Sequence, residues 1–177
     1  MNRTGKITLC GITAALAAAL MLASYFPYLT YAVPALSGLC MMLPVIEINC
    51  KWAFAAYLVS ALPTLFFAEP EAKLLYILLF GYYPVLKAVL DRLPRALGWL
   101  AKLAVLNAAV ALVYCVLAPL IGIPTDEFGA LGKYGAALLW ASANGVFAVY
   151  DLAISRVSVF YMLRIHPKVR KYLRFSG

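Results

Sequence analysis

The feature that most constrains this chain is a series of long apolar runs separated by charged residues or by proline and glycine. The runs cover about residues 6–26, 31–49, 51–68, 72–91, 96–122 and 134–163. About 20 apolar residues are enough for a helix to cross a bilayer. Because the runs lack the alternation of a lipid-facing strand, they predict helices rather than a β-barrel. We therefore expect an all-α, polytopic membrane bundle of about six transmembrane helices, with residues 1–177 forming a single integral membrane domain.

Two of the runs allow a second interpretation. The first run follows a basic start and could imitate a secretory signal, but it continues into further apolar sequence, so we interpret it as the first span. The second run is interrupted by Pro34, Gly38 and Pro44. Proline removes a backbone donor that lipid cannot replace, so we expect this run to be broken or partly re-entrant.

The few charged residues predict the orientation of the chain. Charged residues make up 12% of the sequence and hydrophobic residues 66%. With a cytoplasmic amino terminus and a reversal of direction at each span, only Lys73 and Lys133 of the 15 Lys and Arg residues fall on the outer side. Such a bias is typical of membrane proteins. We therefore expect both termini in the cytoplasm, and we attribute the net charge of +8 to orientation rather than to nucleic-acid binding.

The sequence lacks the residue patterns of an enzyme. Its only histidine, His166, lies beside Pro167 near the carboxyl end, and its four cysteines form no C-x-x-C pair. It contains neither a phosphate-binding loop of the G-x-x-x-x-G-K-[ST] type nor a G-x-S-x-G nucleophile elbow. We therefore expect no catalytic residues, no metal and no cofactor, and any energy that the protein uses has to come from elsewhere.

Two of the runs carry aromatic and charged residues at the same helical spacing. They are Tyr76, Phe80, Tyr83 and Lys87 in one run and Trp140, Asn144, Phe147 and Asp151 in the other. Both helices are expected to run from outside to inside, so Lys87 and Asp151 reach the same depth and can form a buried charge pair. A lone charge at membrane depth costs at least about 2.5–3.5 kcal/mol on insertion scales, which also allows pairing with Arg156, Lys102 or Asp91.

The outer halves of the same two runs hold candidate ligand-binding side chains. These are Tyr76, Tyr83, Trp140 and Asn144. Aromatic faces and an amide can bind a flat small molecule by stacking and hydrogen bonding. Gly81 and Pro84 would bend the helix and make room. Packing of an aromatic layer explains these residues equally well.

The first run carries a strip of small residues. Ala14 and Ala18 share one helical face by their spacing. Small side chains let two helices approach closely in a membrane. The strip therefore predicts either packing within the bundle or docking to another subunit.

The chain resembles the substrate-binding S component of energy-coupling factor (ECF) vitamin transporters of bacteria. The resemblance rests on length, on the hydrophobic pattern, and on a basic start running into KITLCGITAALAAALMLAS with its Ala-x-x-x-Ala strip at Ala14 and Ala18. The segments LLYILLFGYYPVLKAVLDRL and VYDLAISR also look like uncharacterised bacterial membrane proteins grouped loosely with that family.

This resemblance implies a place for the chain in an importer of the bacterial cytoplasmic membrane. The alanine strip would dock on the transmembrane coupling subunit, partner ATPase subunits would supply energy, and the outer halves of the later helices would hold a vitamin or similar small molecule. The competing class is a non-transporting assembly or scaffold protein that resembles the small rod-shape-determining membrane proteins. Its helix faces would serve as docking surfaces.

Overall fold

The computed structural model describes residues 2–26, 28–113, 115 and 135–167, and the regular secondary structure of these residues is helical throughout. Five helices of this part of the chain are long and apolar enough to cross a membrane. They are Arg3–Tyr25, Cys50–Phe67, Pro70–Leu90, Arg95–Leu112 and Trp140–Arg164. The predicted all-α, polytopic membrane architecture is therefore confirmed.

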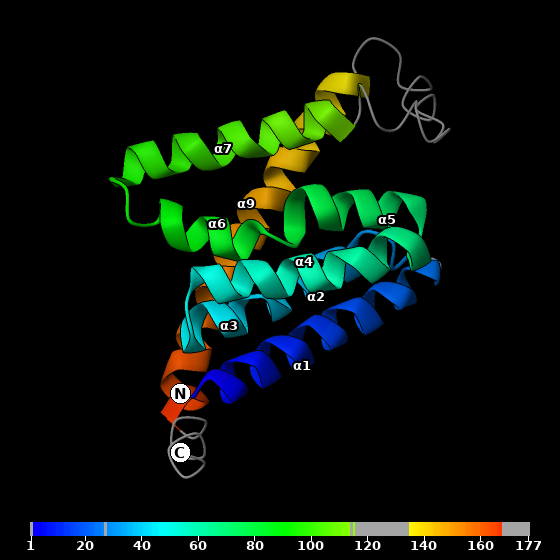
Figure 1. Cartoon of the computed structure of the whole chain (residues 1–177). Coiled ribbons are helices and arrows are strands. Elements are labelled where there is room, and N and C mark those ends of the chain that lie inside the picture. The colour runs from blue at the N-terminus through cyan, green and yellow to red at the C-terminus, as the bar shows by residue number, and fades with distance from the viewer. Residues whose placement is uncertain (1, 27, 114, 116–134, 168–177) are drawn as a thin grey trace.

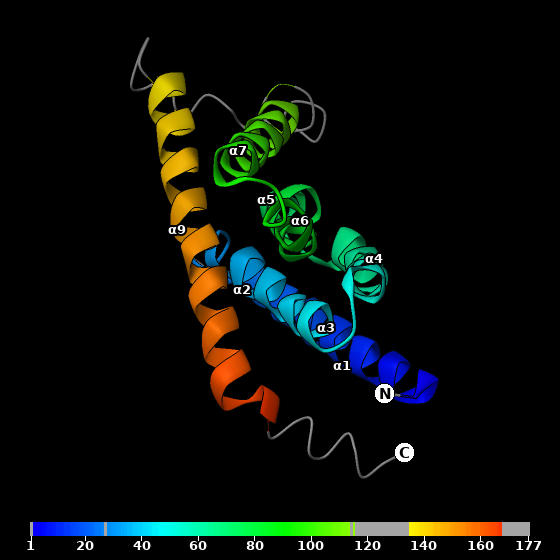
Figure 2. The ribbon, with the colours of Figure 1, turned by 90° about the vertical axis from the view of Figure 1, so that its left-hand side faces the viewer.

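The helices form a stack that one long helix crosses. Their bounds are α1 Arg3–Leu22, η1 Ala23–Tyr25, α2 Ala32–Cys40, α3 Met42–Glu47, α4 Cys50–Phe67, α5 Pro70–Leu75, η2 Tyr76–Phe80, α6 Tyr83–Leu90, α7 Arg95–Leu112 and α9 Gly135–Arg164. Helices α1, α4, α6 and α7 lie beside one another in this order, and α9 runs diagonally across the stack (Figure 1). The α2–α3 segment lies between α9 and α1 (Figure 2).

The second apolar run is broken, as the sequence predicts. Helix α2 ends at Cys40, and α3 begins after Met41. Pro44 has no N–H to donate to the carbonyl of residue 40, so the helix has to restart there, and each proline lies in the first turn of its helix. At 1.5 Å per residue the segment Ala32–Glu47 is about 24 Å long, which is shorter than the ~30 Å hydrocarbon core.

The fourth run bends where Gly81 and Pro84 predict. Helix α5 passes into a π-helical turn, η2, which closes with a 2.8 Å hydrogen bond from the Gly81 N–H to the Tyr76 carbonyl. Pro84 lies in the first turn of α6. A Cβ atom on Gly81 would lie 2.7 Å from the Tyr57 ring of α4, so only glycine allows this close approach.

The buried apolar side chains form two clusters. The α1 cluster contains Cys10, Ala14, Ala17, Met21, Val33, Met41, Ala56, Tyr57, Ala68, Ala72 and Tyr76. The α9 cluster contains Met42, Leu79, Phe80, Tyr83, Leu106, Phe147, Tyr150, Ile154 and Tyr161. The π-helical turn and the break at Gly81 thus divide one apolar run between two cores. Tyr76 belongs to the first core and Tyr83 to the second.

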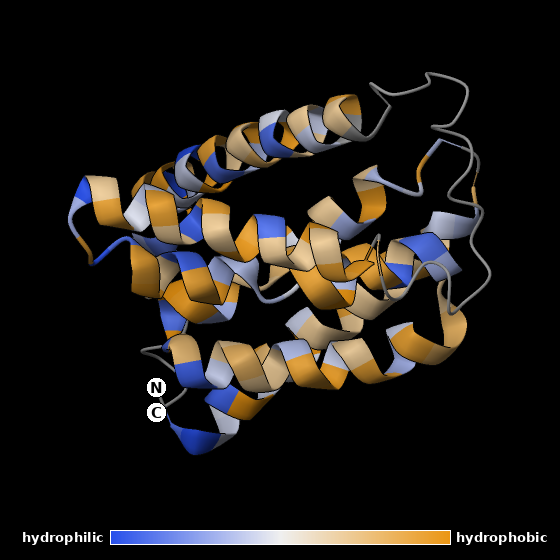
Figure 3. Ribbon diagram, turned by 90° about the horizontal axis from the view of Figure 1, so that it is seen from above, coloured by the Kyte–Doolittle hydropathy of each residue, from blue (hydrophilic) through white to orange (hydrophobic). Residues whose placement is uncertain are grey.

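The two ends of the stack differ in charge. At the basic end lie the α3–α4 and α6–α7 connections, with Lys51, Arg92 and Arg95 nearby, and the amino terminus (Figure 1). At the acidic end lie the α1–α2 and α4–α5 connections, with Glu69 and Glu71. Between these ends, most residues along the helices are hydrophobic (Figure 3). This arrangement suits helices that cross a bilayer.

Candidate functional site

Asp151 in the middle of α9 is the centre of a buried charged cluster. The Lys87 Nζ of α6 lies 2.6 Å from its Oδ1 atom, so the pair predicted from the helical spacing is present. The Lys102 Nζ of α7 lies 3.2 Å from the same oxygen. The Tyr83 hydroxyl donates to it as well, at 2.5 Å. One carboxylate oxygen therefore connects α6, α7 and α9.

Asp91 completes the cluster at its edge. Its Oδ1 atom lies 2.5 Å from the Lys102 Nζ, and its Oδ2 atom lies 3.4 Å from the Lys87 Nζ. Lys102 and Asp91, two of the alternative partners expected from the sequence, both contribute at once. Lys87, Lys102 and Asp151 are buried, whereas the Asp91 side chain is 49% exposed. The four charges sum to zero, which is how a membrane protein accommodates charges away from water.

Tyr76 and Tyr83 have separate roles in the structure. The Tyr76 hydroxyl lies 2.6 Å from the Ser60 Oγ of α4, and its fully buried ring packs against Tyr57. The Tyr83 hydroxyl instead donates a hydrogen bond to the Asp151 carboxylate. Residues seven positions apart, such as these two tyrosines, share one face only in a regular α-helix. The π-helical turn between them breaks that regularity.

Asn144 is engaged with a second amide rather than exposed to a ligand. Its Nδ2 atom lies 3.2 Å from the Asn107 Oδ1 of α7, and the Asn107 Nδ2 lies 3.3 Å from the Asn144 Oδ1. The Asn144 amide also donates to the carbonyl of Trp140, which is half-buried. Such reciprocal pairs hold helices together in membranes.

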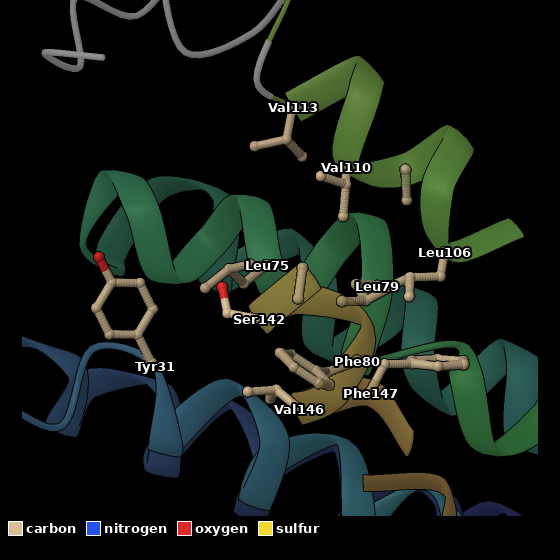
Figure 4. Close-up of a pocket in the computed structure, with 12 residues that line it drawn as sticks. Tyr31, Leu75, Leu79, Phe80, Leu106, Val110, Val113, Ser142, Val146 and Phe147 are labelled. Atoms are coloured by element: carbon tan, nitrogen blue, oxygen red, sulfur yellow. The ribbon is translucent and has the colours of Figure 1, made fainter. Parts of the chain in front are cut away.

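A cavity of about 370 Å³ lies between α7, η2 and α9. Figure 4 shows side chains from these elements pointing into a common space, with Tyr31 at one side. The residues that line it are Tyr31, Leu75, Leu79, Phe80, Leu106, Ala109, Val110, Val113, Ser142, Ala143, Val146 and Phe147. The structure does not place Tyr76, Tyr83, Trp140 or Asn144 in this lining. The volume lies in the range of about 300–1,000 Å³ that small-molecule sites occupy.

One aromatic layer separates the cavity from the charged cluster. Phe147 lines the cavity, and its ring packs edge-on against Tyr83 with 4.8 Å between the ring centroids. Tyr83 in turn donates to Asp151. The cavity therefore lies toward the acidic end from the charges, on the side where the sequence predicts a ligand, but its walls come from other residues.

The alanine strip of α1 is divided between the interior and the surface. Ala14 is 2% exposed and belongs to the α1 cluster, where α1 packs against α4. Ala18 is half-buried. The exposed face of α1 carries Gly11, Ala15 and Ala19 instead. Ala14 therefore packs within the bundle. It is too deeply buried to make the predicted contact with a partner subunit.

A second polar contact, near the end of α9, was missed by the sequence analysis. The Glu47 side chain of α3 is 4% exposed, and its Oε1 atom accepts a 2.7 Å hydrogen bond from the Tyr161 hydroxyl. The His166 Nδ1 atom lies 2.9 Å from the same oxygen. The signal for this contact was the single glutamate in the second apolar run, which needs a partner when buried. In the described part of the chain, no three His, Cys, Asp or Glu side chains converge on a possible metal site.

Fold and cavity together define the class of the protein. It is a polytopic α-helical membrane protein with a largely apolar cavity of small-molecule size. No protein-family model, curated protein or solved structure matches the chain. Its function therefore has to be inferred from its own residues and their geometry.

Proposed function

We propose that this chain is the substrate-binding membrane subunit of an importer, of the kind represented by the S components of ECF transporters. The observation that carries the proposal is the cavity of about 370 Å³ between α7, η2 and α9. A bundle that only supports other proteins has no need of an internal space of this size. The cavity would hold a vitamin or a similar small molecule.

The charge distribution supports the direction of transport. Basic residues gather at one end of the stack, and this end is expected to face the cytoplasm of a bacterial cell. The cavity lies toward the acidic end, which would then face outside. A site in the outer half of the membrane is placed to capture a compound before its import.

Partner subunits would supply the energy. The sequence has no phosphate-binding loop, so ATP hydrolysis belongs to separate ATPase subunits, and a transmembrane coupling subunit would contact this chain. Since Ala14 is buried, such a contact on α1 would use the exposed face with Gly11, Ala15 and Ala19. Small residues allow a partner helix to approach closely.

The same exposed face supports the second candidate function, a scaffold for membrane assembly. A Cβ atom added to Gly11 would meet no atom within 4 Å, so this part of α1 is open to a neighbouring helix. A scaffold would use such a face and leave the cavity without a ligand. The two functions therefore differ in what the cavity contains.

Mass spectrometry of compounds that copurify with the chain in mild detergent tests the proposal. Ala143 lines the cavity, and Ala141 lies exposed two residues earlier on α9. The wild-type chain and Ala141→Phe should retain the same compound, and Ala143→Phe should lose it while keeping its thermal transition. Identical compounds in all three folded preparations, or none in any, would leave the scaffold as the better interpretation.

A further inference from the structure

We infer that the ligand of the cavity is an amphiphile with a hydrocarbon body and a neutral or cationic hydrogen-bonding head group. This inference rests on the proposed function, because it names the substrate class of that same site. Three properties of the cavity carry it: the chemistry of the walls, the position of the hydroxyl groups, and the side on which the cavity is open.

The walls select an apolar body. Among the described residues that line the cavity, none is charged at neutral pH, and most are aliphatic or Phe. An ionised group placed against such walls would lose its hydration without gaining a partner, at a large cost in free energy. A hydrocarbon body loses nothing polar there and fills the space by van der Waals contact.

The hydroxyl groups give the site a polar end. Tyr31 and Ser142 both lie toward one side of the cavity, away from Leu106 and Phe147 (Figure 4). The head group of a bound amphiphile would therefore point to the Tyr31 side, where hydrogen-bonding partners exist.

The charge at this polar end selects against an anionic head group. The Tyr31 hydroxyl donates to the Glu71 Oε2 at 3.0 Å, so a carboxylate stands directly behind it. Glu69 lies two residues before Glu71 in the chain and carries a second carboxylate, whose Oε2 atom is buried without a hydrogen-bond partner among the described residues. Like charges in contact are strongly unfavourable, so an alcohol or an ammonium group fits this end and a carboxylate does not.

The open side of the cavity explains how such a ligand would arrive. Val146 lines the cavity although it is 60% exposed. The neighbouring Gly145 and Val149 are exposed as well and lie outside the lining, so this wall of the cavity adjoins a face that a membrane-spanning helix turns to lipid. An amphiphile dissolved in the bilayer can therefore enter from the side, with its body in the hydrocarbon and its head near the membrane surface.

A matched set of probes tests the inference. Naphthylmethanol, naphthylmethylamine and naphthoate share one apolar body and differ in the head group, which is neutral, cationic and anionic at neutral pH. Their binding to the full chain in nanodiscs of phosphatidylcholine is measured by equilibrium dialysis, with empty nanodiscs subtracted. The alcohol and the amine should bind. The carboxylate should bind with an affinity at least about tenfold lower than theirs.

Two variants and one control locate the effect. Val146→Trp, which narrows the cavity, should abolish binding of the alcohol and the amine. Val149→Trp, placed on α9 at a residue that is 68% exposed and outside the lining, should leave their binding unchanged. Glu71→Gln should bring the affinity for the carboxylate to within about threefold of the alcohol.

The inference is overturned if the carboxylate binds the wild-type chain as tightly as the amine, or if none of the three probes binds a chain that keeps its folded thermal transition. It is also overturned if Val146→Trp and Val149→Trp bind the probes alike. The proposed function would survive these results if a different, polar compound still copurified with the wild-type chain and was absent from Ala143→Phe. Failure of both experiments would remove the proposed function as well.

Discussion

Replacing Asp151 by leucine tests whether the charged cluster holds α6, α7 and α9 together. The substitution removes the oxygen that accepts from Tyr83, Lys87 and Lys102. Only Asp91 then remains for the two buried ammonium groups, and it is 2.5 Å from Lys102 but 3.4 Å from Lys87. Lys87 is thus left with a weak partner. Breaking a buried pair in this way costs about 3–5 kcal/mol of unfolding free energy.

The other charges of the cluster should follow a definite order. Lys87→Met leaves Asp151 with Lys102 and Tyr83, so its cost should be smaller, about 2–3 kcal/mol. Lys102→Met should cost least, about 1–2 kcal/mol, because Asp151 keeps its 2.6 Å contact with Lys87 and the half-exposed Asp91 can be hydrated. The order follows from which ion is left unpaired and from how deeply it is buried.

The double variant Lys87→Met/Asp151→Leu distinguishes a pair from two independent effects. It leaves Lys102 with Asp91, which is a neutral arrangement, so it should be more stable than the sum of the single costs predicts, by about 1–3 kcal/mol. Unfolding of the purified chain in detergent, followed by tryptophan fluorescence, measures each value. The exposed Arg156 provides the control cycle, since Arg156→Met should add to Asp151→Leu without coupling. Additivity within about 0.5 kcal/mol in the test cycle would refute the reasoning.

Three further predictions concern the orientation of the chain, the face of α1 and the role of Tyr83. A cysteine placed at Glu71 should react with an impermeant thiol reagent on intact cells while one at Arg92 should not, because the basic end is expected inside, and the reverse labelling would overturn the orientation. Ala14→Trp should lower the thermal stability strongly, since the site is 2% exposed, whereas Ala15→Trp on the exposed face should leave stability intact; equal stability of the two variants would contradict the packing described. Tyr83→Phe should cost about 1–3 kcal/mol of stability through the lost hydrogen bond without changing which compound copurifies, and loss of that compound from a stable variant would restore Tyr83 as a ligand-binding residue.

The sequence predicts the parts of this fold that the membrane itself enforces. Apolar runs have to become helices because lipid offers no hydrogen bonds to the backbone. The proline at position 44 breaks its helix because it has no N–H to donate. Lys87 and Asp151 are found together because neither can remain unpaired at membrane depth. In each case the membrane imposes one strong requirement, and few arrangements of the residues satisfy it.

The ligand site depends on choices that leave no comparable signal. The π-helical turn before Gly81 turns Tyr76 toward α4, and residue spacing alone assumes a regular helix. The amide of Asn144 is occupied by Asn107 of α7, and nothing in the spacing of the two residues in the sequence predicts this pair. The walls of the cavity are built from ordinary leucine, valine and alanine, whose place in the sequence does not differ from that of residues facing lipid. Such a site becomes visible only when the helices are in place.

Helix α9 is held near its middle by the contacts of Asp151 with α6 and α7, so that a part of the helix, or arm, extends on either side of this point. At 1.5 Å per residue, about 24 Å of helix precede Asp151 and about 20 Å follow it to Arg164. The first arm carries Ala143 beside the cavity, and the second carries Tyr161, which contacts Glu47 of α3. A rigid rod held at an interior point moves its arms in opposite directions. The Asn107–Asn144 pair ties the first arm to α7, and the Tyr161–Glu47 contact ties the second arm to α3. A ligand that pushed the first arm away from α7 would therefore strain contacts at both ends of α9 at once.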